Sequence, residues 1–230
     1  MLSPVFMDRP GALCGLCQRL HPPFERAVAY GNYDGGLRDL IHLLKYQQVR
    51  PAAAVLGRMV AEAAAGLDTA LPKGAIQVVP VPLHPRKQSQ RGFNQAELIS
   101  RVAFQQLDCQ QRFQLLMGAL VRQRETGSQI GLTRHQRREN LRGAFAVIDP
   151  TQIAHRDILL VDDVFTTGTT ASECARVLRR AGASKVWVVT AARTLKTFDA
   201  FALRNDFWKK ESDEKERTEC EAGHVLAASG

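Results

Sequence analysis

The sequence contains few tyrosines and tryptophans and an odd number of cysteines, and each shortage excludes a class of protein. Three Tyr and two Trp in 230 residues argue against an aromatic platform for stacking nucleic-acid bases. Five Cys, scattered except for one pair, argue against a disulfide framework and favour a reducing compartment. No apolar run reaches the ~18 residues of a membrane helix, and the start, MLSPVFMDRPGALC, lacks the regions of a signal peptide. We therefore expect a cytoplasmic protein without membrane insertion.

Negative charge is scarce in most of the chain. The net charge is +8, and residues 196–230 hold six Lys or Arg and eight Asp or Glu, so residues 1–195 carry +10. A basic body of this kind indicates anionic partners, either the phosphates of a small ligand or a nucleic-acid backbone. A merely soluble basic surface explains the same count, so charge alone does not decide between them.

Short apolar runs alternate with helical patterns between residues 25 and 195. Strands are expected within residues 26–35, 75–82, 118–123, 144–148, 157–163 and 185–193. Helices are expected at 36–48, 51–66, 94–108 and 170–182. This alternation is typical of right-handed βαβ crossovers, so it predicts an α/β domain with a mostly parallel sheet and helices on both faces.

Two segments of different composition flank this domain. Residues 1–24 are Pro-rich and contain the cysteine pair, Cys14 and Cys17. Residues 196–230 mix both charge signs, and their apolar residues cluster in the first half at near-helical spacing. We expect a short helix there, followed by a disordered end that has too little apolar surface to fold.

The stretch ILLVDDVFTTGTT, residues 158–170, combines a core strand, two acids and a Thr- and Gly-rich loop. Ligands of open parallel sheets bind beyond the carboxyl ends of the strands, where Asp162 and Asp163 are expected. Carboxylates there accept hydrogen bonds from hydroxyls or hold a hydrated divalent cation. Adjacent strand residues point to opposite faces, so both acids can serve one ligand only if the strand is ending.

The loop in this stretch leads directly into a predicted helix. A helix N-terminus exposes unpaired N–H groups and a positive dipole end, and Gly168 lets the backbone close around an anion. A ribose that carries a 5′-phosphate would use both the acids and the loop. The alternative is a plain strand–helix turn with Thr169 as the N-cap.

The same stretch resembles the phosphoribosyl-pyrophosphate (PRPP) signature of type I phosphoribosyltransferases, with apolar residues, an acidic pair and a T-G-x-T loop. The resemblance implies that Asp162 and Asp163 bind the ribose 2′ and 3′ hydroxyls, and that Mg²⁺ is bound with PRPP. It implies that the 5′-phosphate binds the loop residues Thr166, Thr167, Gly168, Thr169 and Thr170. Purine-salvage members have a general-base acid at the position of Thr166, so here a nucleophile that needs deprotonation is disfavoured.

Three further segments resemble the ComF/GntX family of competence protein ComFC-like proteins. They are YDGGLRDLIHLLKY (33–46), VVPVPLHPRKQSQRGFNQAE (78–97) and TGSQIGLTRHQRRENLRGAF (126–145), and the resemblance runs from about residue 14 to Thr194. The second resembles a pyrophosphate-binding loop, with Arg86, Lys87, Arg91 and Gly92. The third resembles the flexible catalytic loop of type I enzymes, with candidates Gln129, Arg134, Arg137, Arg138 and Asn140. Either basic segment, taken singly, also fits a solvated loop.

The cysteine pair has the spacing of a zinc ribbon. ComF-type proteins usually carry two such pairs, whereas here only one remains, Cys14 and Cys17. His21 would supply a third ligand for Zn²⁺, and a tetrahedral site would still lack a fourth. The other interpretation is a degenerate or truncated ribbon with two free thiols.

The resemblance implies a type I phosphoribosyltransferase-like fold with a small N-terminal ribbon remnant and hood. Two functions stay open. An enzyme would use PRPP or ribose 5-phosphate with Mg²⁺, displace pyrophosphate at C1 and transfer the phosphoribosyl group to an acceptor that the sequence does not name. A non-catalytic competence factor would instead bind single-stranded DNA on the basic loops. The resemblance links both to DNA uptake and the competence machinery.

Overall fold

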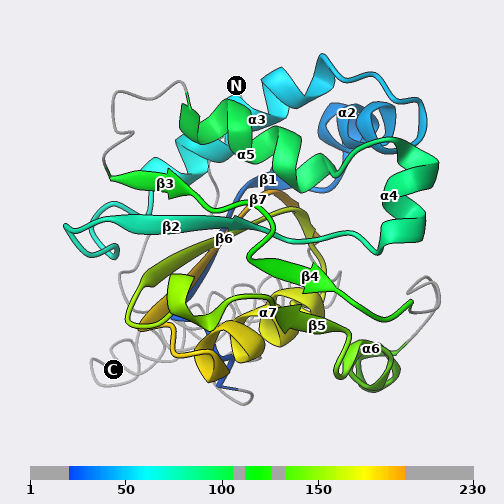
Figure 1. The fold of residues 1–230 in the computed structure, drawn as a ribbon. Coiled ribbons are helices and arrows are strands. Elements are labelled where there is room, and N and C mark those ends of the chain that lie inside the picture. Colours follow the sequence, from blue (N-terminus) through cyan, green and yellow to red (C-terminus); the bar gives the residue numbers. More distant parts are fainter. Residues whose placement is uncertain (1–20, 106–111, 126–132, 195–230) are drawn as a thin grey trace, which may run out of the picture. The chain divides into compact units, whose positions relative to one another are not determined.

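The computed structural model describes residues 21–105, 112–125 and 133–194 (Figure 1). All of them belong to the first of the two units into which the chain divides, Met1–Thr194 and Leu195–Gly230. Their elements are β1 (Arg26–Asn32), α2 (Gly35–Tyr46), α3 (Ala52–Ala65), β2 (Ile76–Pro80), α4 (Pro85–Arg91), α5 (Gln95–Gln105), β3 (Phe113–Leu115), β4 (Leu120–Arg122), α6 (Arg134–Leu141), β5 (Phe145–Val147), η1 (Pro150–Gln152), β6 (Asp157–Phe165), α7 (Thr169–Arg180) and β7 (Lys185–Arg193). Among these elements no helix is both long and apolar enough to cross a membrane.

Five parallel strands form the central sheet, in the order β1-β7-β6-β2-β3. In the middle of the sheet, Val161 of β6 lies opposite Val189 of β7 and Pro80 of β2. The chain continues from β2 to β3 in one direction and from β6 to β7 in the other. The carboxyl ends of the neighbours β2 and β6 therefore form a topological switch point, where open α/β sheets bind their ligands.

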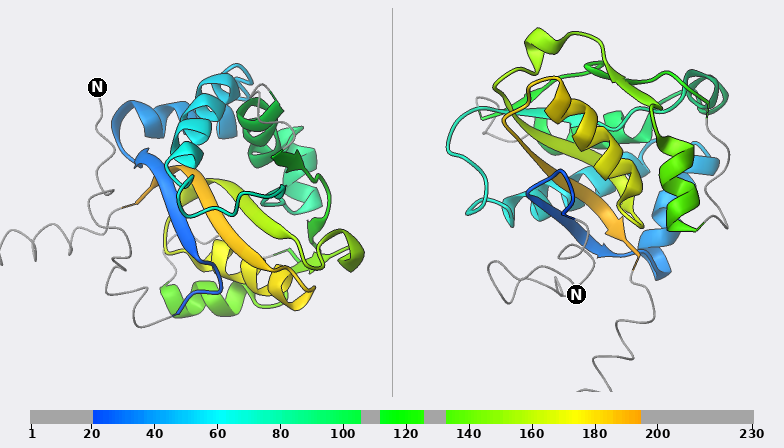
Figure 2. Two further views of the ribbon diagram at one scale, coloured as in Figure 1. Left: turned by 90° about the vertical axis from the view of Figure 1, so that its left-hand side faces the viewer. Right: turned by 90° about the horizontal axis from the view of Figure 1, so that it is seen from below.

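Helices cover both faces of the sheet, and each face has its own hydrophobic core. On one face pack α2, α3 and α5, and α2 contributes the buried Leu37, Ile41 and Leu44 at helical spacing. On the other face packs α7, with Cys174 and Leu178 fully buried. Beside α7 lie α6 and the small antiparallel sheet of β4 and β5 (Figure 2). The prediction of a mostly parallel sheet with helices on both faces is confirmed.

The segment after β2 differs from its prediction, because it forms the helix α4 and not a loop. The His84 side chain caps the first turn by accepting a hydrogen bond from the Arg86 N–H, and Pro85 is the first helical residue. Gly92 ends the helix in the left-handed conformation, with φ of 76°. The short strand β3 was not predicted, since its three residues are too few to show the alternation of apolar and polar residues that marks a strand.

The basic segment that resembles a flexible loop also contains regular structure. Arg134–Leu141 form α6, which begins with a capping box between Thr133 and Gln136. On either side of it β4 and β5 pair antiparallel, with Val121 opposite Ala146. The segment is therefore the connection of a hairpin, which keeps its two ends close together.

Candidate functional site

Both segments that were expected to bind phosphate lie at the switch point. The loop of residues 166–168 follows β6, and α4 follows β2, its neighbour in the sheet. The Val81 N–H donates to the Val161 carbonyl at 2.8 Å, so the pairing of the two strands reaches this edge. In Figure 1 the chain runs from β2 straight to α4 on the right of the view. The tertiary structure thus brings together two motifs that are far apart in the sequence.

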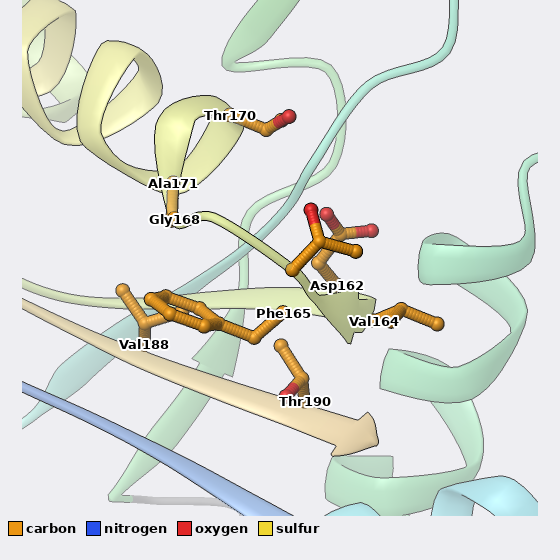
Figure 3. Close-up of a pocket in the computed structure, with 9 residues that line it drawn as sticks. Asp162, Val164, Phe165, Gly168, Thr170, Ala171, Val188 and Thr190 are labelled. Carbon is orange, nitrogen blue, oxygen red and sulfur yellow. The ribbon is translucent and has the colours of Figure 1, made fainter. Parts of the chain in front are cut away.

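The two acids lie within β6, which continues to Phe165, and they serve different faces of the sheet. Asp163 is buried on the face of α2, α3 and α5, where its Oδ2 lies 2.5 Å from Nζ of Lys45 on α2. Asp162 lies on the opposite face and lines a hollow beside the Thr- and Gly-rich loop (Figure 3). Of the two acids, Asp162 is the one that a ligand in this hollow would meet first.

The charges of these three groups are linked. Burial, and after it the neighbouring Asp163 carboxylate, raises the pKa of Asp162 to about 8. Burial by itself would lower the pKa of the Lys45 ammonium, but the Asp163 carboxylate raises it above the ordinary 10.5. Asp162 Oδ1 also accepts a hydrogen bond of 2.9 Å from the Asp163 N–H. At neutral pH the edge therefore holds one ammonium–carboxylate pair and one carboxyl group that is able to keep a proton.

The Thr- and Gly-rich loop requires glycine at its centre. Gly168 is the N-cap of α7 with φ of 71°, and a Cβ at this position would lie 2.6 Å from Cζ of Phe165. Thr169 is the first helical residue, so it is not the N-cap that the alternative of a plain strand–helix turn assigned to it. The Thr169 hydroxyl lies 2.8 Å from that of Thr167, which ties the loop to the first turn of the helix.

The hollow beside the loop is small and open. In Figure 3 the Asp162 carboxyl and the Thr170 hydroxyl lie above β6, while the Phe165 ring packs under the loop against Val188. Its volume is about 240 Å³, open solvent at its mouth included.

The helix α4 presents basic side chains at the same edge. Arg86 and Lys87 lie in its first turn, and Arg86 Nη1 is 3.3 Å from Glu125 Oε2 in the hairpin. Both of these side chains are exposed, so the pair is weak and a phosphate can compete for Arg86. At the other end of the helix, Arg91 Nη1 donates to Gln95 Oε1 at 2.6 Å. The basic side chains that were predicted on a loop are thus held on a helix.

Hydrogen bonds anchor the hairpin next to this edge. Arg124 Nη2 donates to the carbonyls of Asn140 and Arg142, at 2.9 and 2.8 Å. The Gly143 N–H donates to Glu173 Oε1 of α7 at 3.0 Å. The base of the hairpin is therefore attached to the helix α7, whose first residues belong to the Thr- and Gly-rich loop.

The candidates of the flexible loop are distributed over and beyond α6. Arg138 and Asn140 lie on this helix, Arg138 exposed and Asn140 half-buried. Arg134 and Arg137 belong to α6 as well, and Gln129 lies outside the described residues. Their contact with a ligand stays a prediction.

The structure does not describe Cys14 and Cys17, which lie outside the described residues. His21 is exposed, with φ of 41°. Within the described part of the chain, no group of three or more His, Cys, Asp or Glu is placed to hold a metal ion. Zn²⁺ at this end of the chain stays a prediction.

Sequence reasoning missed Lys45, although a signal was present. Lys45 follows Ile41 by four residues and so lies beside the apolar stripe of α2 that includes Leu44. A lysine next to a buried stripe indicates a buried partner, because lysine is almost never fully buried unless it is paired. Arg124 gave no such signal, since it binds carbonyls that are distant in the sequence, and the bond of Glu173 to Gly143 spans 30 residues.

The comparisons with known proteins agree with the resemblance of the motifs. No protein-family model matches the sequence. DNA utilization protein YhgH of Escherichia coli is 37% identical over 188 residues, which cover 79% of this chain and 78% of that protein. Competence protein F of Haemophilus influenzae is 34% identical over 185 residues, 78% of each chain. The chain belongs to the ComF/GntX family. Competence protein ComFC of Streptococcus pneumoniae, 31% identical over 118 residues, covers 51% of this chain and 48% of its own length.

Solved structures with similarity to this chain include phosphoribosyltransferases. The allosteric regulatory enzyme of purine biosynthesis is 22% identical, with a TM-score of 0.38 over 61% of this chain and 26% of that one. Hypoxanthine phosphoribosyl transferase of Trypanosoma cruzi is 13% identical, with a TM-score of 0.32 over 62% of this chain and 64% of that one. Because both TM-scores are below 0.5, the assignment to the phosphoribosyltransferase-like class rests on the family and on the strand order of this ComF-family chain.

Proposed function

We propose that this ComF-family chain binds PRPP, or another ligand with a ribose 5-phosphate group, at the switch point between β2 and β6. One observation carries the proposal: the Asp162 carboxyl and the N-terminus of α7 line the same open hollow at the end of β6. A phosphate suits the N–H groups and positive dipole end of α7. A ribose attached to that phosphate brings its hydroxyls toward Asp162.

The remaining groups have distinct roles in this proposal. Asp162 accepts hydrogen bonds from ribose hydroxyls, whereas Asp163 pairs with Lys45 and ties β6 to α2. The diphosphate of PRPP extends toward α4, where Arg86 and Lys87 supply positive charge. The Thr166 hydroxyl lies at the hollow in place of an acid.

Magnesium fits the site as a partner of the ligand. Asp162 is the acidic side chain in the hollow and would bind the ion after losing its proton, and the described residues form no cluster of three His, Cys, Asp or Glu side chains that could hold the ion alone. Mg²⁺ commonly binds through one or two carboxylates together with substrate phosphates and water, so a PRPP-bound ion needs little more from the protein. When bound, it would neutralise charge on the leaving pyrophosphate.

Transfer of the phosphoribosyl group is the catalytic part of the proposal. The bond from C1 of the ribose to the pyrophosphate breaks, a bond from C1 to the acceptor forms, and pyrophosphate leaves with the electron pair. Thr166 has a hydroxyl whose proton is held far too tightly for it to act as a base near neutral pH. The acceptor is therefore expected to be a nucleophile that needs no deprotonation by this residue.

The biological setting is proposed from the relatives. Their names, competence protein F and DNA utilization protein, place those proteins in DNA uptake and use. The second candidate function is a non-catalytic competence factor that binds single-stranded DNA. It is favoured by one observation, the three basic residues Arg86, Lys87 and Arg91 on the short helix α4.

Thermal unfolding with PRPP and Mg²⁺ tests the first function. A ligand present at 100 times its Kd stabilises the folded state by ~2.7 kcal/mol, so the melting temperature should rise. Asp162→Asn should remove the shift, whereas Asp39→Asn, at an exposed acid of α2, should keep it. An unchanged melting temperature of the wild type at millimolar PRPP would refute the proposal.

The salt dependence of binding tests the second function. Affinity for single-stranded DNA should fall by roughly 0.7 log units per phosphate contact for each log unit of salt. Replacing Arg86, Lys87 and Arg91 by Ala should flatten this slope. Replacing the exposed Arg58 and Arg101 of α3 and α5 should not. A protein that binds no strand even at ~50 mM salt would leave this function to partner proteins.

A further inference from the structure

The segment YDGGLRDLIHLLKY, residues 33–46, contains a row of rings that the phosphoribosyl site does not use. The Tyr33 hydroxyl lies 2.9 Å from Nε2 of His42. The His42 ring meets the Tyr46 ring edge-on, with the centroids 5.2 Å apart and the planes at 75°. His42 and Tyr46 are four residues apart on α2 and therefore lie on one face of the helix. The row supports the Tyr46 ring from one side.

Tyr46 is the outermost ring of this row and faces solvent. It is 66% exposed, whereas Tyr33 and His42 are partly buried. A ring that is already held in place has little rotamer freedom to lose when a flat ligand binds to it. The exposed face is therefore suited to stacking.

Arginine contacts bring this ring next to α4. Cζ of Arg91, the last residue of α4, lies 5.8 Å from the centroid of the Tyr46 ring. Nearby, Cζ of Arg50 lies 5.4 Å from the centroid of Phe93, so the α2–α3 connection packs against the end of α4. Figure 1 shows α2 and α4 as neighbours on the right of the view. A ligand on Tyr46 would thus meet positive charge as well as a π face.

We propose that Tyr46 is a stacking site for a nucleobase whose phosphate lies on α4. A nucleobase has a π face for the tyrosine, and the phosphate of a nucleotide or of a single strand supplies the anion for Arg91. PRPP has no base, so this site goes beyond the proposed PRPP function. The low content of Tyr and Trp argued against a platform of several rings, and the structure presents a single ring.

A protein partner fits this surface less well than a nucleobase. The large apolar side chains that are exposed in the described residues are Tyr46, Val49 and Ile148. The cores of protein interfaces combine several apolar side chains and are depleted of charge, whereas here arginine lies against the ring. The surface therefore favours a flat and anionic ligand.

Binding of a labelled oligodeoxythymidylate of about eight nucleotides tests the site. Stacking contributes ~1–3 kcal/mol per base, so Tyr46→Ala should weaken binding about 5- to 150-fold while Tyr46→Phe keeps most of the affinity. The salt slope should not change, because stacking releases no counterions. Ile148→Ala is the matched control, since Ile148 is an equally exposed apolar residue (65%) outside this segment.

Two further probes separate the base from the backbone and the strand from the free nucleotide. An abasic oligomer with the same number of phosphates should bind equally to the wild type and to Tyr46→Ala. If Tyr46→Ala also loses thymidine monophosphate, the site takes free nucleotides. If the loss is limited to the oligomer, the site takes the bases of a strand.

The proposal is overturned if wild type and Tyr46→Ala bind the oligomer and thymidine monophosphate with equal affinity. It is also overturned if Tyr46→Ala loses the abasic oligomer to the same extent as the base-containing one. The melting temperature with PRPP is measured on the same variants. A wild type that ignores PRPP but binds bases through Tyr46 contradicts the proposed function and leaves the stacking site intact.

Discussion

Lys45→Met should destabilise the protein strongly, because it leaves a buried carboxylate without its counter-ion. The side chains of Lys45 and Asp163 are 17% and 6% exposed, and Nζ and Oδ2 are 2.5 Å apart. Removing one partner of a buried pair costs ~3–5 kcal/mol, and the partial exposure of Lys45 favours the lower end. For a domain of this size, each kcal/mol lowers the melting temperature by roughly 2–4 °C, so a drop of roughly 6–12 °C is expected.

A double-mutant cycle with Asp163→Asn tests this reasoning. If the loss comes from the unpaired charge, Lys45→Met with Asp163→Asn should be more stable than Lys45→Met alone. Lys73→Met, at an exposed lysine, is the control and should change stability by less than ~0.5 kcal/mol.

The stabilisation by this pair in the wild type depends on pH through the Lys45 ammonium. The pKa of Lys45 is raised in the folded protein, so the stabilisation by the pair is complete below the ordinary 10.5 and is lost as the pH rises through the folded value. Neutral conditions should therefore retain the pair fully. Additive effects of the two substitutions, or a Lys45→Met protein that melts with the wild type, would refute the role of this pair.

Three other predictions follow from the site and its flanks. The pKa of Asp162 is raised from 3.8 to about 8, so its contribution to stability is complete below pH 3.8 and is lost as the pH rises toward 8. The melting temperature of Asp162→Asn should therefore depend less on pH over this window than that of the wild type. Gly168→Ala should lower the free energy of unfolding, measured in urea, by ~1–3 kcal/mol because of its φ of 71°, and further because a Cβ would overlap Phe165. Gly36→Ala, where a Cβ would meet no other atom, is the control and should be neutral, and an equally neutral Gly168→Ala would contradict the loop geometry. Deleting residues 210–230 should leave melting temperature and PRPP binding unchanged, and a drop of several degrees would show that the tail belongs to the fold.

The strand and loop of the site could be predicted because their signals are local. The run from Ile158 to Thr170 contains the signals of the buried strand, the two acids and the glycine-centred turn in consecutive residues. Helix α2 was equally readable, since Leu37, Ile41 and Leu44 repeat with the helical period. The composition likewise sufficed for the basic charge, and the alternation of strand and helix patterns sufficed for the α/β class.

Local sequence signals gave a wrong prediction for the segment after β2, where the capping residues decide that a helix forms. The segment from Pro85 to Arg91 is polar and basic, which is typical of a loop. It is a helix because His84 caps its first turn and Gly92 ends it. A seven-residue helix buries no apolar stripe, so no period was there to find.

The amino-acid sequence by itself determined which residues are the candidates for chemistry: the acidic pair, the Thr- and Gly-rich loop, and the basic residues after β2. Only the tertiary structure decided which partner each of these residues contacts. The pleat of β6 turns Asp162 to the hollow and Asp163 to Lys45, and the last residue of α4, Arg91, lies beside Tyr46 at the end of α2. These partners are distant in the chain, so their pairing depends on how the sheet and helices pack together and cannot be predicted from a local sequence pattern.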